Sequence, residues 1–228
     1  MSKHIAFIGV GNMGNPMAQQ LVNAGKQVKV FDVSEQAIKI AKENGLNVVN
    51  SLDELLSNSS AVISMLPEGK HVKELYLGEN GILKKISQDS LIIECSTIDI
   101  ETSLKIGDHA KSLGIKMIDA PVTGGVMGAR VGKLNFLVGG SQEAVKLATP
   151  LLEIMGQKIL HAGEQGSGVG VKICNNMSLG ISMIAASETL MLAKRLKMDI
   201  KIPKILKIWI FLLFFLFASQ RKKIVIPK

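Results

Sequence analysis

Three glycines that follow an apolar segment constrain the fold of this chain more than any other feature of its sequence. Residues 5–8 are apolar and predict a buried strand, and Gly9 permits the tight turn that must follow it. Gly11 would let bare backbone approach a ligand, and Gly14 removes a side chain where the next helix has to contact the strand. This order of residues is typical of the first strand, phosphate-binding turn and helix of a dinucleotide-binding βαβ unit.

An acidic residue follows the second expected strand and completes this pattern. We expect a helix over residues 12–24 and a strand over residues 27–31, which leads directly to Asp32. A carboxylate there can accept hydrogen bonds from ribose hydroxyls and would repel a 2′-phosphate, so the sequence predicts NAD rather than NADP as the cofactor. In the alternative interpretation Asp32 caps the next helix, a role that Ser34 could fill equally well.

Short apolar strands and helices alternate through the rest of residues 1–163. This alternation predicts an α/β fold with a Rossmann-like, doubly wound and mostly parallel sheet that helices cover on both faces. A capping box is expected over residues 51–54. The further strands are expected at 47–49, 61–66, 90–94, 116–118, 135–138 and 158–161, and the further helices at 35–44, 100–112 and 142–155.

The C-terminal part differs from this NAD-binding Rossmann domain. Residues 169–197 lack proline and place apolar residues at helical spacing, so we expect one long helix, and residues 164–199 would begin a helical second domain. Residues 200–228 form an atypical basic and apolar tail with an uninterrupted apolar run at 208–218, which is too short to cross a membrane. An exposed aggregation-prone patch is the simpler interpretation of that run, and an interfacial membrane anchor is the alternative.

Composition excludes some classes of protein. The net charge is +8, but residues 200–228 hold seven Lys and Arg and no acid, so no basic stripe along a folded domain indicates nucleic-acid binding. Neither Cys95 nor Cys174 has the spacing of a metal or redox site, and we expect both to be reduced and buried. No secretion-signal pattern precedes the first strand, which favours a cytoplasmic location, and no metal site is expected.

Small and hydroxyl-bearing residues follow the expected strands at the edge where parallel sheets bind ligands. These positions are Leu66–Pro67, Ser96–Thr97 and residues 119–125. Within the last segment, Thr123–Gly125 could cradle a carboxylate, since the glycines expose N–H groups and the threonine adds a hydroxyl donor. A plain glycine turn would show the same spacing.

Lys172 and Asn176 are four residues apart on the expected long helix and therefore share one face. If its ammonium were desolvated, the pKa of Lys172 would fall, and the neutral amine could take a hydroxyl proton while a hydride leaves the carbon. Asn176 could hold Lys172 or the reacting oxygen in place. A solvated surface lysine is the alternative, and the adjacent Asn175 points roughly 100° away.

Three ordered segments resemble the successive signatures of the β-hydroxyacid dehydrogenase family. They are FIGVGNMGNPMA at 7–18, DAPVTGG at 119–125 and GVGVKICNNM at 168–177, and the similarity extends over residues 3–199. The resemblance implies reversible hydride transfer from a 3-hydroxy acid to NAD, which gives a semialdehyde without decarboxylation.

The same resemblance implies a role for each candidate residue. Lys172 would be the catalytic lysine and Asn176 its polar companion. The substrate carboxylate would bind at Thr123, Gly124 and Gly125. The residues that would contact the cofactor are Gly9, Gly11, Asn12, Met13, Gly14, Asp32, Leu66, Pro67 and Thr97.

The chain departs from the family pattern after residue 199. Family members continue into an all-helical domain that adds a lysine-containing cofactor motif and much of the subunit interface, whereas here the composition changes abruptly, as a frameshift or an alternative end would produce. Our first hypothesis is a dehydrogenase with a truncated second domain, for which the family's homo-oligomer is doubtful. The rival hypotheses are a catalytically inactive NAD-binding fragment and a reductase of tartronate semialdehyde.

Overall fold

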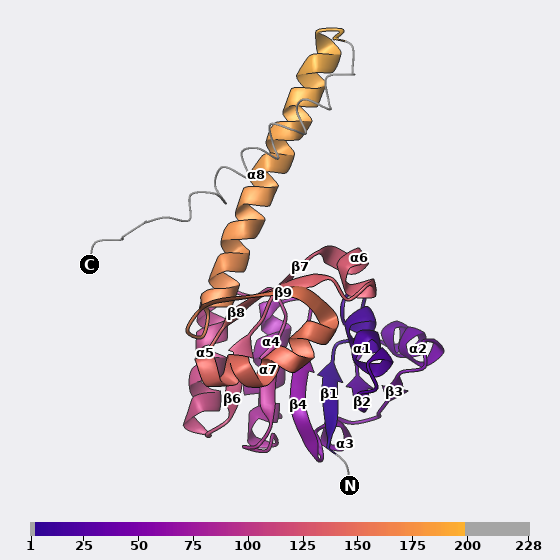
Figure 1. Cartoon of the computed structure of the whole chain (residues 1–228), viewed down its shortest axis with the longest axis vertical. Helices are drawn as coiled ribbons and strands as arrows, with labels where there is room; N and C mark the ends of the chain where they lie inside the picture. The colour runs from indigo at the N-terminus through magenta and orange to yellow at the C-terminus, as the bar shows by residue number, and fades with distance from the viewer. Residues whose placement is uncertain (1–2, 199–228) are drawn as a thin grey trace, which may run out of the picture. The chain divides into compact units, whose positions relative to one another are not determined.

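The computed structural model describes residues 3–198 and has a nine-stranded sheet in the first of two compact units (Figure 1). The first unit comprises residues 1–173 and the second residues 174–228. The strand order is β3-β2-β1-β4-β5-β6-β8-β7, and β9 pairs with β8. The atypical tail expected at 200–228 lies outside the described residues.

The sheet is mostly parallel, as the sequence predicts. Strands β1 to β6 pair in parallel, whereas β8 runs antiparallel to both β6 and β7 and parallel to β9. All five residues of β1 are buried, which is the pattern of a strand covered on both faces. The strands are β1 His4–Ile8, β2 Val28–Phe31, β3 Asn47–Val48, β4 Ser59–Ser64, β5 Leu91–Glu94, β6 Lys116–Asp119, β7 Val122–Thr123, β8 Leu134–Gly139 and β9 Gly156–Gly163.

Helices of the first unit pack against both faces of this sheet. One buried cluster joins the sheet to α1 and α7 through residues such as Met17 and Leu152, and a second cluster joins it to α4 and α5 through Tyr76 and Ile106. The elements are α1 Gly14–Asn23, α2 Glu35–Glu43, α3 Leu52–Leu56, α4 Gly69–Leu77, the 3-10 helix η1 Ile82–Lys84, α5 Ile100–Ser112, α6 Gly125–Arg130 and α7 Gln142–Met155.

Side-chain caps explain where several helices begin. Ser34 Oγ accepts a hydrogen bond from the Ala37 amide, 3.3 Å away, so Ser34 caps α2 and the capping interpretation of Asp32 is wrong. At the expected capping box, Ser51 Oγ accepts from the Glu54 amide at 3.2 Å. Helices α4 and α6 were not predicted, because neither has a side-chain cap and α6 contains two glycines in six residues.

The long helix α8 spans Ser167–Arg195, two residues earlier at each end than predicted. It carries exposed apolar side chains such as Ile181 and Ile184. By length and composition alone α8 could cross a membrane, and this is weak evidence, because a buried core helix of a soluble protein passes the same test. The prediction that both cysteines are buried holds for Cys95 and is wrong for Cys174, which is exposed on α8.

Candidate active site

The glycines of the turn after β1 have distinct surroundings. A Cβ atom on Gly14 would collide with the carbonyl oxygen of Gly9, and one on Gly9, where φ is +88°, would collide with the Met65 carbonyl. A Cβ on Gly11 would meet nothing within 4 Å. Gly9 and Gly14 therefore allow close packing of the turn, whereas Gly11 leaves its outer side open to a ligand.

Asp32 connects this turn to the start of α2. Its Oδ2 accepts a hydrogen bond from the Val10 amide at 2.7 Å, and its Oδ1 accepts from the Ser34 amide at 2.8 Å. Each carboxylate oxygen retains a second lone pair, so the side chain can accept further hydrogen bonds from a diol. The carboxylate thus links the turn after β1 to the segment between β2 and α2.

A cavity of about 690 Å³ adjoins these residues and has the size of a small-molecule or cofactor site. Its lining includes eight of the nine cofactor residues implied by the family resemblance: Gly9, Gly11, Asn12, Met13, Gly14, Asp32, Leu66 and Pro67. The ninth, Thr97, is exposed and does not line this cavity. The donor-rich turn, the carboxylate and the apolar wall fit a dinucleotide.

Sequence reasoning missed one wall of this cavity. The cavity is also lined by three residues of α4, His71, Glu74 and Leu75, and by Asn80, which follows α4 in the sequence. No side chain caps the start of α4, and no helix is predicted from the sequence after Pro67. A helix between β4 and β5 is nevertheless what a parallel pair of strands requires, because the chain must cross over between them.

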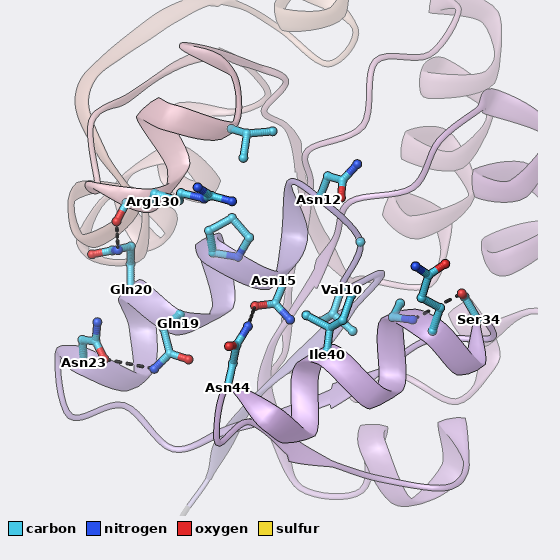
Figure 2. Close-up of a pocket in the computed structure, with 15 residues that line it drawn as sticks. Val10, Asn12, Asn15, Gln19, Gln20, Asn23, Ser34, Ile40, Asn44 and Arg130 are labelled. Atoms are coloured by element: carbon cyan, nitrogen blue, oxygen red, sulfur yellow. Dashed lines mark hydrogen bonds between the residues drawn. The ribbon is translucent and has the colours of Figure 1, made fainter.

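A second cavity, of about 790 Å³, runs along the outer side of α1 and is lined by side-chain amides (Figure 2). Asn44 Nδ2 donates to Asn15 Oδ1 at 2.8 Å, which joins α2 to α1. Gln20 Nε2 donates to the Arg130 carbonyl at 2.8 Å, which joins α1 to the end of α6. These two bonds fix the helix that follows the phosphate-binding turn.

Asp119, at the end of β6, holds the beginning of α8. Its Oδ1 accepts from the Gly166 amide at 2.7 Å and its Oδ2 accepts from the Val169 amide at 2.8 Å. The carboxylate is fully buried, and this burial raises its pKa, while the backbone hydrogen bonds oppose the increase. A carboxylate at this point also complements the positive end of the helix dipole. The start of α8 is thereby attached to the sheet.

Lys172 lies less than two turns after the start of α8 and is half-buried. Burial lowers the pKa of its ammonium, in the direction that proton abstraction by a neutral amine requires. Asn176 is one turn further along the same helix, on the same side by its spacing, and is exposed. The division between the two units falls between Ile173 and Cys174.

The segment Thr123–Gly125 joins β7 to α6. Gly124 has φ of +120° and Gly125 has φ of +60°, so both adopt conformations that favour glycine. Asn135 Nδ2 donates to Thr123 Oγ1 at 3.3 Å. Neither this segment nor Lys172 lines the cavity beside the phosphate-binding turn. Among residues 3–198, no cluster of His, Cys, Asp and Glu could hold a metal ion.

Comparisons with known proteins agree with this geometry. Residues 4–163 match the family model of the NAD-binding domain of 6-phosphogluconate dehydrogenase. The chain is 47% identical over 195 residues to a 3-hydroxyisobutyrate dehydrogenase of Pseudomonas aeruginosa, covering 86% of this chain and 65% of the relative. It is 44% identical over 190 residues to an NAD-dependent L-serine dehydrogenase of the same organism, covering 83% of this chain and 64% of that relative.

A solved structure shows the same fold. The 3-hydroxyisobutyrate dehydrogenase of Mycobacterium tuberculosis, determined with L-serine, superposes with a TM-score of 0.81 at 39% identity and covers 87% of this chain and 67% of that one. The chain spans slightly less than two thirds of the length of the curated relatives named above. Residues 4–163 make up more than half of the chain, so the chain has the NAD-binding domain of 6-phosphogluconate dehydrogenase. Its likeness to 3-hydroxyisobutyrate dehydrogenases, with 39% identity to a solved structure of which it covers 67%, shows that the chain belongs to the β-hydroxyacid dehydrogenase family.

Proposed function

We propose that this chain is an NAD-dependent oxidoreductase that oxidises the hydroxyl group of a 3-hydroxy acid. The observation that carries the proposal is the cavity beside the phosphate-binding turn, where Gly11 leaves room for a pyrophosphate and Asp32 lies at the end of β2. Asp32 supports NAD over NADP, because its carboxylate would repel a 2′-phosphate.

The oxidation removes a hydride from the hydroxyl-bearing carbon, and bound NAD would supply the acceptor for it. Lys172 would take the hydroxyl proton at Nζ, and the burial that lowers its pKa favours the neutral amine that this step needs. Thr123–Gly125 would bind the substrate carboxylate through a hydroxyl and exposed backbone amides. Asn176 would hold the amine or the reacting oxygen. The products are a semialdehyde, NADH and a protonated Lys172.

The proposed substrate is 3-hydroxyisobutyrate, which would give methylmalonate semialdehyde in valine degradation. The name of the relative with 47% identity supports this choice. L-serine is a second candidate, because it is also a 3-hydroxy acid and another relative is named an NAD-dependent L-serine dehydrogenase. Relative kcat/KM values of the purified chain for these two acids and for tartronate semialdehyde distinguish the three substrates.

The lysine assignment is tested by Lys172→Ala. We expect turnover to fall at least ~100-fold, because no base remains for the hydroxyl proton, while the NADH dissociation constant stays within about twofold. Lys146→Ala, at an exposed position of α7, is the matched control and should keep wild-type turnover. Steady-state rates and a fluorescence titration with NADH provide both quantities. Unchanged turnover in Lys172→Ala contradicts the assignment.

The rival proposal is a dinucleotide-binding protein without turnover. The observation behind it is that neither Lys172 nor Thr123–Gly125 lines the cavity beside the phosphate-binding turn. NADH binding without oxidation of any of the 3-hydroxy acids would support this rival and exclude the dehydrogenase proposal.

A further inference from the structure

A buried carboxylate lies directly behind the cofactor cavity and has no place in the chemistry described so far. Glu94 is the last residue of β5, and its side chain is fully buried. Within residues 3–198 it has no ion-pair partner. Burying an unpaired carboxylate is costly, so the residues that contact it are informative.

Three hydrogen bonds converge on one oxygen of the Glu94 carboxyl group. Glu94 Oε1 accepts from the Ser96 amide at 2.9 Å, from the Ser96 hydroxyl, and from Ser64 Oγ at 3.3 Å. Glu94 Oε2 is buried and has no hydrogen-bond partner among the residues that the structure describes. All three bonds therefore direct donors toward a single acceptor, an arrangement that strengthens when the carboxyl group is charged.

Ser96 and Ser64 connect Glu94 to residues at or next to the wall of the cavity. Ser96 Oγ accepts from the Leu66 amide at 2.8 Å, and Leu66 lines the cavity. Ser64 Oγ lies 2.8 Å from Tyr76 Oη, and because the Ser64 hydroxyl donates to Glu94, the tyrosine hydroxyl must be the donor to Ser64. Tyr76 follows Leu75, another lining residue, on α4.

We propose that Glu94 is a positioning residue for the dinucleotide: through Ser96 it holds the β4–α4 turn at Leu66, and through Ser64 it holds α4 at Tyr76. This inference rests on the dinucleotide binding proposed above. The two contacts fix opposite ends of one cavity wall, which presents Leu66 and Leu75 to the ligand. Loss of the charge on Glu94 weakens both contacts and so weakens ligand binding.

The groups around Glu94 make its charge sensitive to pH. Burial raises the pKa of Glu94 to about 7, the hydrogen bonds from Ser96 and Ser64 oppose the increase, and the charge of Asp119 on β6 adds to it. Tyr76 on α4 and Cys95, the residue after β5, also interact electrostatically with the carboxyl group, and burial raises the pKa of each, so both stay neutral. The carboxyl group consequently gains and loses its proton near neutral pH.

The experiment measures the NADH dissociation constant of the full chain from pH 6 to pH 8.5. Wild type should bind roughly tenfold more weakly at pH 6 than at pH 8.5, since a neutral carboxyl accepts weaker hydrogen bonds. Glu94→Gln keeps the shape and lacks the charge, so the roughly tenfold loss of affinity that Glu94 causes between pH 8.5 and pH 6 should be absent from this variant. Glu101→Gln, an exposed position on α5, should retain the wild-type profile. His71 is present in every variant, so its effect cancels in the comparison.

Ser96→Ala tests whether Glu94 acts through Ser96. At pH 8.5 this variant should bind NADH roughly tenfold more weakly than wild type, as Glu94→Gln should. The double variant Glu94→Gln/Ser96→Ala should bind no more weakly than either single variant. Additive losses, or a wild-type profile in Glu94→Gln, overturn the inference. If Glu94→Gln does not fold, the Ser96→Ala profile decides the question alone, and a wild-type pH dependence in it overturns the inference.

Hydrogen exchange of the Leu66 amide separates this inference from the proposed function, because it needs no ligand. After correction for intrinsic exchange, the amide should exchange roughly tenfold faster in Glu94→Gln and Ser96→Ala than in wild type at pH 8. If the Leu66 amide exchanges more slowly in wild type than in both variants but the chain binds no NADH, the proposed function is wrong and the positioning role of Glu94 stands. If the Leu66 amide exchanges at the same rate in wild type and in both variants, the inference is wrong, even if the chain binds NADH.

Discussion

The glycines of the phosphate-binding turn are under different constraints, as the sequence predicts. At Gly14 an added methyl group meets backbone, namely the Gly9 carbonyl, which cannot rotate away. At Gly11 it meets open space beside the cavity, and the backbone there does not adopt a positive φ. Gly14 is therefore required for folding, whereas Gly11 is required for ligand approach.

This difference predicts opposite effects of two matched substitutions. Gly14→Ala should lower the free energy of unfolding by about 2 kcal/mol or more, because the helix must shift from the strand. Gly11→Ala should change it by less than ~0.5 kcal/mol but weaken NADH binding at least tenfold, since the methyl group occupies the space for the pyrophosphate. Urea denaturation and an NADH titration measure both. Normal NADH affinity in Gly11→Ala would contradict the assignment of the cavity.

At the scale of elements, the attachment of α8 to the sheet depends on one side chain. Asp119 uses both oxygens to accept amide hydrogens from the first turn of α8 and the residue before it. Close packing supports this contact, because a Cβ on Gly139 would collide with Asp119 Oδ1. Lys172 follows within the next turn, so its position depends on this contact.

Asp119→Asn should destabilise the first unit by about 2 kcal/mol. The amide nitrogen would face a backbone N–H group and leave a buried donor without an acceptor. Asp108→Asn, at an exposed position of α5, is the control and should change the stability by less than ~0.5 kcal/mol. Urea denaturation gives the stability, and hydrogen exchange of the Val169 amide reports whether the loss is at the start of α8. If the Val169 amide exchanges at the same rate in Asp119→Asn as in wild type, the role of Asp119 at the start of α8 is contradicted.

At the scale of the whole molecule, two buried carboxyl groups lie side by side in the sheet. Glu94 and Asp119 are register partners at the ends of β5 and β6, and both are fully buried. Burial raises the pKa of each above its ordinary value. Between the ordinary pKa and the raised one, the folded state keeps a proton that the unfolded state has released, so stability falls as pH rises.

The stability of the chain should therefore be lower at pH 8 than at pH 5. For Glu94, whose pKa rises from 4.5 to about 7, the loss between these pH values is on the order of 3 kcal/mol. Glu94→Gln should reduce this difference, and Glu101→Gln should leave it as in wild type. Urea denaturation at both pH values measures the effect. Equal pH dependence in wild type and Glu94→Gln would show that Glu94 does not titrate in this range.

Local features of the sequence determined the first half of the dinucleotide site. Gly9, Gly11, Gly14 and Asp32 belong to one continuous strand, helix and strand, so spacing and composition alone predict their arrangement. The α/β class and the mostly parallel sheet follow from the same alternation of apolar strands and helices. Spacing and residue chemistry suggest roles for Lys172, Asn176 and Thr123–Gly125, the family resemblance selects these roles over the structural alternatives, and the roles stay predictions.

Only the tertiary structure decided which distant groups meet behind and beside that site. The Leu66 amide bonds to a side chain 30 residues later, and Asp119 bonds to amides 47 and 50 residues later. Such contacts depend on the order of the strands in the sheet, which brings residues distant in sequence together. The sequence determined the turn that approaches the cofactor, because that geometry is local. The tertiary structure determined the wall and the buried carboxylates that hold it, because burial and hydrogen bonding across strands arise only when the sheet has formed.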